Sequence, residues 1–170
     1  MANNPPFLPP PAEAPYRLAV ATPAGTLTLE AGADALTGLT WRRRQADRPS
    51  RLLVNAAAQL TSYFAGTLKA FALPLAPRGS AHELTVWAEL CRIPYGETIT
   101  YGELARRAGS VARAVGGTCG ANPIAIVIPC HRVTAAGGQL GGYSGGNGPD
   151  SKRRLLAHEA KHAGIFSLAP

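Results

Sequence analysis

A cysteine, a histidine and an arginine follow one another at Cys130, His131 and Arg132, and they have the clearest potential for covalent chemistry. They come directly after an apolar, mostly β-branched run at residues 124–128 and a proline, Pro129. We expect the run to form a short buried strand or an extended core segment, with Pro129 keeping the chain before it extended. A thiol fixed at the edge of a packed core beside an imidazole and a guanidinium is a candidate nucleophile.

The spacing of the cysteine and the histidine does not decide their role by itself. A cysteine next to a histidine is more often structural than catalytic. The elements that position Cys130 and the segments that surround it must therefore distinguish the two interpretations.

The region from Gly79 onward begins with a helix. Residues 80–83, Ser-Ala-His-Glu, have the pattern of a capping box, and Pro94-Tyr95-Gly96 ends the helix. Its apolar residues share one face, which predicts that this face is buried: Val86, Trp87, Leu90 and Ile93.

Two short helices joined by a glycine turn are expected next. Thr100 and Glu103 form a second capping box for a helix that runs to Ala108, and Ser110 is the expected cap of the following helix. This is the layout of a helix-turn-helix motif, although such turns also occur in proteins that never contact DNA.

The second of these helices carries one long cation, Arg113, among small residues. A narrow helix surface of this kind fits the ~6 Å minor groove of DNA, and a tight helix–helix contact is the alternative. The small residues are Ala112, Ala114, Gly116, Gly117, Thr118, Gly120 and Ala121.

The chain after Cys130 contains a glycine-rich loop and a final helix. Residues 137–148 hold seven glycines around Tyr143 and Ser144, a composition suited to backbone lying close against a flat ligand, or to a linker. Asp150 or Ser151 is expected to begin a helix that passes through Glu159. Its early cations at residues 152–154 are interpreted as solvated, with DNA contact as the alternative.

The region before Gly79 is predicted to be a small sheet with one helix and carries no recognisable chemistry. We expect a hairpin of strands at 17–21 and 26–30, a third strand at 36–41, a helix from Ser50 to about Ala65, and an edge strand at 70–75. The basic triplet 42–44 is interpreted as a charged strand end rather than a phosphate contact. Residues 1–15 contain six of the fifteen prolines and predict a flexible, disordered or extended tail.

Composition narrows the class of protein. The 170 residues, 46% of them hydrophobic, suit one or two small domains, and a net charge of +7 permits a polyanionic partner without proving one. Three cysteines match neither a disulfide framework nor a zinc pattern, so we expect reduced thiols, no metal and no cofactor. Neither a membrane span nor a signal peptide is recognisable, and we expect a cytoplasmic protein.

The chain from Tyr16 onward, and most strongly from Gly79, resembles the O6-alkylguanine-DNA alkyltransferase family. The resemblance implies a mixed α/β (α+β) fold, with an N-terminal ribonuclease H-like domain at 16–78 and a mostly helical, winged-helix-like domain at 79–170 that contains the helix-turn-helix. It rests on these segments: Val86-Trp87, Ile93-Pro94-Tyr95-Gly96, Thr100-Tyr101-Gly102, residues 112–116, Asn122-Pro123, Pro129-Cys130-His131-Arg132, Tyr143-Ser144-Gly145-Gly146 and residues 155–159.

The resemblance also implies roles for individual residues. Cys130 would accept the alkyl group, His131 would act as base, Glu159 would orient His131, and Asn122 would tie the site together by hydrogen bonds. The implied substrate contacts are Tyr101, Val133, Tyr143, Ser144, Gly145 and Cys119. The implied DNA contacts are Arg113, which would fill the gap in the base stack, and Ala112, Ala114, Thr100 and Gly120.

Chemical reasoning agrees with these roles. Neighbouring side chains of an extended segment point to opposite sides, so His131 would reach the Cys130 sulfur through a water. Glu159 would favour the His131 imidazolium, which would stabilise the Cys130 thiolate. The O6 atom of guanine lies on the base-pairing side, so the nucleotide must leave the stack, and the resulting thioether is a poor leaving group, which predicts a single turnover.

The resemblance implies double-stranded DNA containing O6-alkylguanine, and also O4-alkylthymine, as the partner, bound through the minor groove. We expect a monomer, with clustering along DNA left open. His82 stands where the family usually has phenylalanine, which affects local packing, and Cys119 and Gly120 depart from the usual residues, which predicts weaker DNA binding. A non-catalytic DNA-binding or damage-sensing module and a cysteine hydrolase are the two alternative functions.

Overall fold

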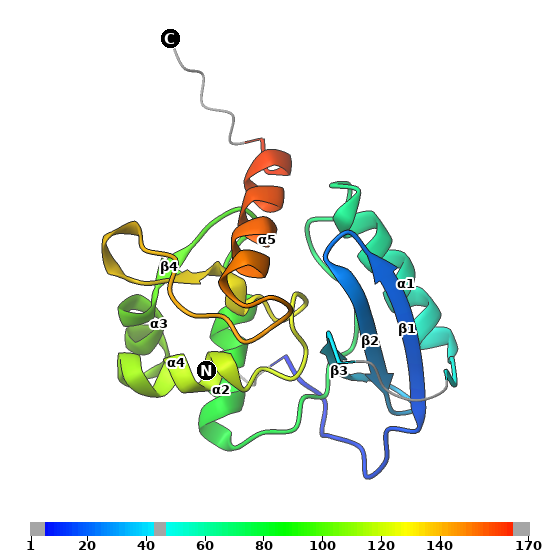
Figure 1. The fold of residues 1–170 in the computed structure, drawn as a ribbon. Helices are drawn as coiled ribbons and strands as arrows, with labels where there is room; N and C mark the ends of the chain where they lie inside the picture. The colour runs from blue at the N-terminus through cyan, green and yellow to red at the C-terminus, as the bar shows by residue number, and fades with distance from the viewer. Residues whose placement is uncertain (1–5, 43–46, 165–170) are drawn as a thin grey trace.

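The computed structural model describes residues 6–42 and 47–164 of the chain. A three-stranded sheet with one helix lies beside a group of helices, and the chain reaches the helices after it has completed the sheet (Figure 1). The fold is therefore mixed α/β, as expected.

The sheet is antiparallel and follows the order of the sequence. Its strands are β1 (Tyr16–Thr22), β2 (Gly25–Ala31) and β3 (Leu36–Thr40). Leu29 at the centre of β2 pairs with Leu18 of β1 and Leu39 of β3, so apolar side chains meet across all three strands. The predicted hairpin and third strand are confirmed.

Helix α1 (Arg51–Phe64) packs on this sheet, against β1 and β2. The side chain of Ser50 accepts a hydrogen bond from the backbone N–H of Leu53, as its predicted role as a cap requires. The buried face of the helix consists of Leu53, Ala56, Leu60 and Tyr63.

The described part of the segment before the sheet, residues 6–15, makes hydrogen bonds to the rest of the protein. The backbone N–H of Leu8 donates to the carbonyl of Leu75 (2.8 Å), and the Arg78 guanidinium donates to the carbonyl of Pro11 (2.8 Å). Residues 1–5, and Arg43 and Arg44 of the basic triplet, lie outside the described residues.

The expected edge strand at residues 70–75 is not formed. Leu75 alone makes bridges, to Phe7 and to Leu36, while the preceding residues have no strand geometry. Two prolines flank the point of pairing, Pro74 and Pro77, and proline cannot donate to a strand ladder.

Helix α2 (Ala81–Cys91) begins with both halves of the predicted capping box, between Ser80 and Glu83. Its apolar face is buried as predicted, and the Trp87 indole N–H donates to the carbonyl of Thr118 (3.0 Å). This bond ties α2 to helix α4 (Ala112–Gly120).

Helix α3 (Tyr101–Ala108) follows the two-residue strand β4 (Ile99–Thr100) and packs against α2 and α4. Gly109 ends α3 in the left-handed conformation (φ 61°), which glycine adopts without strain. The predicted pair of short helices joined by a glycine turn is therefore present.

The caps of these two helices need correction. Thr100 accepts from the backbone N–H of Glu103, but the Glu103 carboxylate turns away to Arg106 and Arg107, so the box is half formed. The cap position of α4 is Val111, which has no capping side chain, whereas the Ser110 hydroxyl contacts His82.

The apolar run at residues 124–128 forms a tight turn and not a strand. Ile124 pairs with Leu39, Ala125 bridges to Ile128, and Ile126 takes a positive φ of 71° that a β-branched residue rarely adopts. All the same, the run is buried as expected, except for the half-buried Val127.

The chain then enters a 3₁₀ turn, η1 (Cys130–Arg132), and the short strand β5 (Val133–Thr134), which pairs in parallel with β4. The final helix α5 (Pro149–His162) begins one residue before Asp150 and two before Ser151, the two predicted starts, with Pro149 in its first turn. No helix in the described part of the chain is long and apolar enough to cross a membrane.

We predict that Ser80→Ala lowers the free energy of unfolding by about 1 kcal/mol, because it removes the side chain that caps α2. Ser110→Ala is the matched control and should lower the free energy of unfolding by less, since Ser110 caps no helix. Urea unfolding of both variants measures the difference. Equal losses in the two variants would contradict the assignment of the caps.

Candidate active site

Cys130 is held by the tight turn before it. The side-chain N–H₂ of Asn122 donates both to the carbonyl of Ile128 (2.7 Å) and to the Cys130 sulfur (3.2 Å), while its carbonyl oxygen accepts from the N–H of Ile124 (3.0 Å). Asn122 therefore joins the two ends of the turn to the thiol, and the backbone at Cys130 is 3₁₀ rather than extended.

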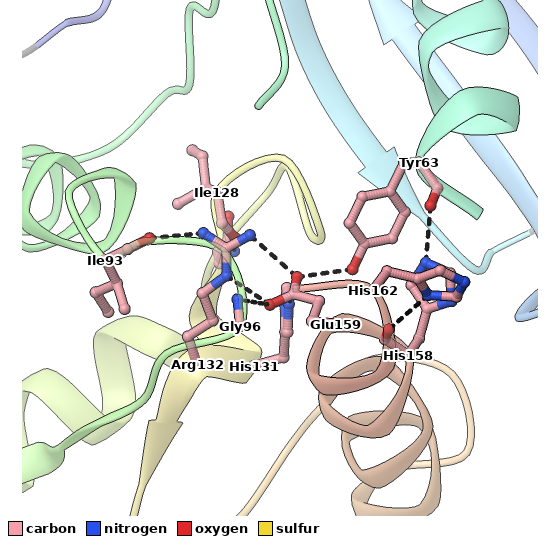
Figure 2. Close-up of polar contacts among 10 residues, drawn as sticks. Tyr63, Ile93, Gly96, Ile128, His131, Arg132, His158, Glu159 and His162 are labelled. Atoms are coloured by element: carbon pink, nitrogen blue, oxygen red, sulfur yellow. Dashed lines mark hydrogen bonds and ion pairs between the residues drawn. The ribbon is translucent and has the colours of Figure 1, made fainter. Parts of the chain in front are cut away.

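The buried carboxylate of Glu159 is the centre of a hydrogen-bond network that includes His131, the residue after Cys130 (Figure 2). Its Oε1 accepts from His131 Nε2 (2.7 Å), Arg132 Nη2 (3.0 Å) and the Tyr63 hydroxyl (2.8 Å). Its Oε2 accepts from Arg132 Nε (2.9 Å) and the backbone N–H of Gly96 (3.2 Å). The predicted contact between His131 and Glu159 is present.

Glu159 is ionised in this network. Burial alone would raise the pKa of its carboxyl, but the hydrogen bonds and charges of His131 and Arg132 outweigh burial and hold the pKa well below its usual range. An ionised carboxylate only accepts hydrogen bonds, so His131 Nε2 must carry a proton.

Burial lowers the pKa of His131, and the Arg132 and Lys152 charges add to this effect against the opposing pull of Glu159. The resting imidazole is neutral, with its proton on Nε2 and the lone pair on Nδ1. Glu159 favours the imidazolium, as expected, but its effect does not outweigh burial. The physical reason is that Arg132 already neutralises Glu159, so the carboxylate has little charge left to offset the burial of a second cation.

Burial likewise raises the pKa of the Cys130 thiol, although the hydrogen bond from Asn122 and the Lys152 charge act in the other direction. The thiol is therefore protonated at rest, and the expected stabilisation of its thiolate applies to the reaction. Nδ1 of His131 is buried and has no hydrogen-bond partner among the described residues, so it is available as a base.

The thiol opens on a cavity of about 600 Å³ between α3, α4 and the glycine-rich loop. Most of the predicted substrate and DNA contacts line it. The lining residues are Tyr101, Ala112, Arg113, Gly116, Cys119, Gly120, Cys130, Gly142, Tyr143 and Ser144.

Four predicted contact residues do not line this cavity. Gly145 lines an adjoining cavity of about 460 Å³, which also reaches Cys130. Val133 is fully buried in β5, whereas Thr100 and Ala114 are exposed and line neither of the two cavities.

The glycine-rich loop folds against the protein. The Ser144 hydroxyl donates to the carbonyl of Gly120 (3.0 Å), and the Tyr143 ring meets Trp41 edge-on, with 6.2 Å between the ring centroids. The loop therefore forms one wall of the cavity rather than a linker.

Lys152 is buried, which corrects its interpretation as a solvated cation. Its Nζ donates to the carbonyl of Gly142 (3.1 Å) and contacts the Tyr101 hydroxyl (3.4 Å). Burial lowers the pKa of Lys152, while the two thiols of the cavity, Cys130 and Cys119, oppose this shift.

Sequence reasoning missed Lys152, Tyr63 and the bidentate role of Arg132. The available signal for Tyr63 was a tyrosine next to the apolar Phe64 in the predicted helix, because a buried tyrosine hydroxyl usually finds a polar partner. His82 contacts the Ser110 hydroxyl (2.8 Å) away from the cavity, consistent with an effect on packing alone.

Comparisons with known proteins agree with this geometry. A family model described as "6-O-methylguanine DNA methyltransferase, DNA binding domain" matches residues 81–161. The chain is 46% identical over 154 residues to a methylated-DNA–protein-cysteine methyltransferase of Mycolicibacterium paratuberculosis, covering 85% of this chain and 92% of the relative. A relative of the same name in Methanosarcina acetivorans is 53% identical over 106 residues, or 61% of this chain and 67% of the relative.

Solved structures show the same fold. Mycobacterium tuberculosis OGT in complex with DNA is 44% identical and superimposes with a TM-score of 0.78, covering 86% of this chain and 94% of that structure. The O6-methylguanine-DNA methyltransferase of Pyrococcus kodakaraensis, at 22% identity and a TM-score of 0.51, covers 85% of this chain and 98% of that structure and supports the fold alone.

We predict that acid destabilises the protein through the buried network. The pKa values of His131 and Glu159 are lower in the folded state than in the unfolded chain, so unfolding takes up protons as pH falls. Stability should begin to fall below pH ~6.5 because of His131, by up to ~1.4 kcal/mol per pH unit, and further below ~4.3 because of Glu159.

The measurement is urea unfolding at several pH values between 7 and 5 for the wild type and for His131→Asn. The variant lacks the titrating ring and should show a smaller loss over this range. The same slope in both proteins would contradict the neutral, buried state of His131.

Proposed function

Because the chain belongs to the methylated-DNA–protein-cysteine methyltransferase family, we propose that it repairs DNA by direct reversal, moving an alkyl group from O6-alkylguanine, and also from O4-alkylthymine, to Cys130. The observation that carries the proposal is the position of the Cys130 sulfur. Cys130 lines an open cavity, Asn122 donates to its sulfur, and the next residue along the chain, His131, is hydrogen-bonded to Glu159.

The network supplies a base at the moment of reaction. A water between the Cys130 thiol and His131 Nδ1 would pass the thiol proton to the imidazole. Glu159 then faces an imidazolium, which its ionised carboxylate stabilises. The sulfur attacks the alkyl carbon, the bond from that carbon to O6 breaks, and the bonding electrons go to the guanine.

The walls of the cavity can stabilise the departing guanine. Burial raises the pKa of Tyr101 to about 12, so its hydroxyl keeps its proton and can donate it in a hydrogen bond to the purine N3. Backbone N–H groups near Ser144 would donate to O6. Lys152 Nζ, in contact with the Tyr101 hydroxyl, adds positive charge where negative charge develops.

Arg113 supports the extrusion of the nucleotide. It is exposed at the cavity and makes no hydrogen bond or ion pair with the residues that the structure describes. The neighbouring Ala112, Ala114 and Gly120 are small and exposed, so α4 can approach a narrow minor groove closely. Arg113 would fill the space that the extruded base leaves, which offsets part of the cost of a few kcal/mol.

The reaction ends with a stable product. An S-alkylcysteine is a thioether, and no second nucleophile in the proposed mechanism displaces it, so each molecule acts once.

We further propose action as a monomer in the cytoplasm, with domains at 16–78 and 79–170. The grouping of the sheet with α1, apart from the helices that surround Cys130, supports this division (Figure 1).

We predict that incubation with a duplex containing O6-methylguanine adds one methyl group to the peptide that carries Cys130. Mass spectrometry of the digested protein measures the product. Cys130→Ser should gain none, whereas Cys91→Ser, a thiol that lines neither of the two cavities at Cys130, should gain one.

The other two candidate functions give different results in this experiment. A binding module would retain the duplex without any gain in mass, and a cysteine hydrolase would turn over repeatedly without retaining a methyl group. Either result would contradict the proposal.

We predict that Arg113→Ala weakens binding to the same duplex by roughly tenfold or more, since it removes both a cation and the group that supports the open stack. Arg51→Ala makes the same change of charge at the exposed start of α1 and should have a smaller effect. Fluorescence anisotropy at a fixed salt concentration compares them. Equal losses would show that Arg113 contributes only its charge.

A further inference from the structure

Glu159 receives one of its hydrogen bonds from the N-terminal part of the chain. Tyr63 belongs to α1, on the sheet, and stands 96 residues before Glu159 in the sequence. Both side chains are fully buried, and the Tyr63 hydroxyl donates to Oε1 over 2.8 Å (Figure 2). Helix α1 therefore reaches the hydrogen-bond network of Glu159 and His131.

The oxygen that Tyr63 contacts is the one that His131 uses. Oε1 is shared by the Tyr63 hydroxyl, His131 Nε2 and Arg132 Nη2, whereas Oε2 accepts from Arg132 Nε and the Gly96 backbone. A carboxylate oxygen has about two lone-pair sites, so three donors compete on Oε1. The hydrogen bond from the Tyr63 hydroxyl therefore weakens the hydrogen bond between Oε1 and His131 Nε2.

The position of Tyr63 is fixed from several sides. Its ring meets Tyr95 edge-on at 6.0 Å and Phe71 at 5.4 Å between centroids. Its backbone carbonyl accepts a hydrogen bond from Nε2 of His158 (2.7 Å), and His158 is the residue before Glu159 on α5. The hydroxyl is consequently held on Oε1 and cannot turn away without breaking this packing.

We infer that Tyr63 is a positioning residue for the alkyl transfer: its hydroxyl orients the Glu159 carboxylate and limits how strongly that carboxylate draws on His131. This inference rests on the function proposed above. It assigns to the N-terminal part of the chain a role in the reaction beyond packing.

The direction of the effect follows from the charges around His131. Arg132 on η1 and Lys152 on α5 oppose protonation of the ring, and Glu159 favours it. Burial and the Glu159 charge raise the pKa of Tyr95, but its hydroxyl has no hydrogen-bond partner among the described residues. Without the Tyr63 hydroxyl, the bond between Glu159 and His131 strengthens, so the pKa of His131 should rise.

The test compares Tyr63→Phe with Tyr95→Phe. Both replacements remove one buried hydroxyl from neighbouring rings, that of Tyr63 fully buried and that of Tyr95 half-buried, but only the first removes a hydrogen bond to Glu159. The single-turnover rate of methyl transfer is measured against pH, and the acid limb reports the protonation of the base. We expect Tyr63→Phe to move this limb to higher pH by roughly half a unit or more, about threefold in proton affinity, and Tyr95→Phe to leave it in place.

A structural role alone would lower the rate of Tyr63→Phe equally at every pH, and an unmoved acid limb would overturn the inference. NMR titration of the His131 ring in both variants supplies a reading that does not depend on alkyl transfer. If the wild type fails to accept a methyl group, the proposed function fails, while the titration still reports on Tyr63. An unchanged His131 titration in Tyr63→Phe would overturn the inference by itself.

Discussion

The structure depends on keeping one negative charge, that of Glu159, inside the protein. A buried carboxylate is strongly unfavourable unless it is paired and its lone pairs accept hydrogen bonds. Arg132 supplies the opposite charge in a bidentate arrangement, and Tyr63, His131 and the Gly96 N–H saturate the remaining positions. Helix α5, the 3₁₀ turn at Cys130, the segment after α2, and α1 are thereby fixed relative to one another.

This arrangement explains why the Cys130 thiol is unreactive before a substrate binds. Burial keeps His131 neutral and Cys130 a thiol, because Glu159 offsets it only in part at His131, and Asn122 and Lys152 only in part at Cys130. A protein that can react only once benefits from a thiol that resists adventitious oxidation and alkylation. In the proposed reaction, proton transfer accompanies the entry of a flipped base, and the thiolate exists only when the alkyl carbon is close.

Local sequence patterns predict those parts of the fold that local physics decides. The alternation of residues at 17–30 predicts the hairpin, Ser80 and Glu83 predict the start of α2, and the small residues around Arg113 predict a narrow helix. The resemblance to a family adds the contact between His131 and Glu159, which no local pattern contains.

The remaining features arise from tertiary packing. Lys152 lies in a run of three cations that suggests a solvated face, yet the loop that carries Gly142 covers it. Tyr63 reaches Glu159 only after α1 and α5 have packed together. The turn at Ile126 runs against the extended preference of a β-branched residue, and its pairing with Leu39 on β3 and its closure by Asn122 override that preference.

The protonation of the His131 ring in the resting wild-type protein tests this account most directly. The ¹⁵N chemical shifts of the imidazole at pH 7 distinguish a protonated nitrogen from one that carries a lone pair. The account predicts a proton on Nε2 and a lone pair on Nδ1. Protons on both nitrogens would show an imidazolium at rest and would contradict it.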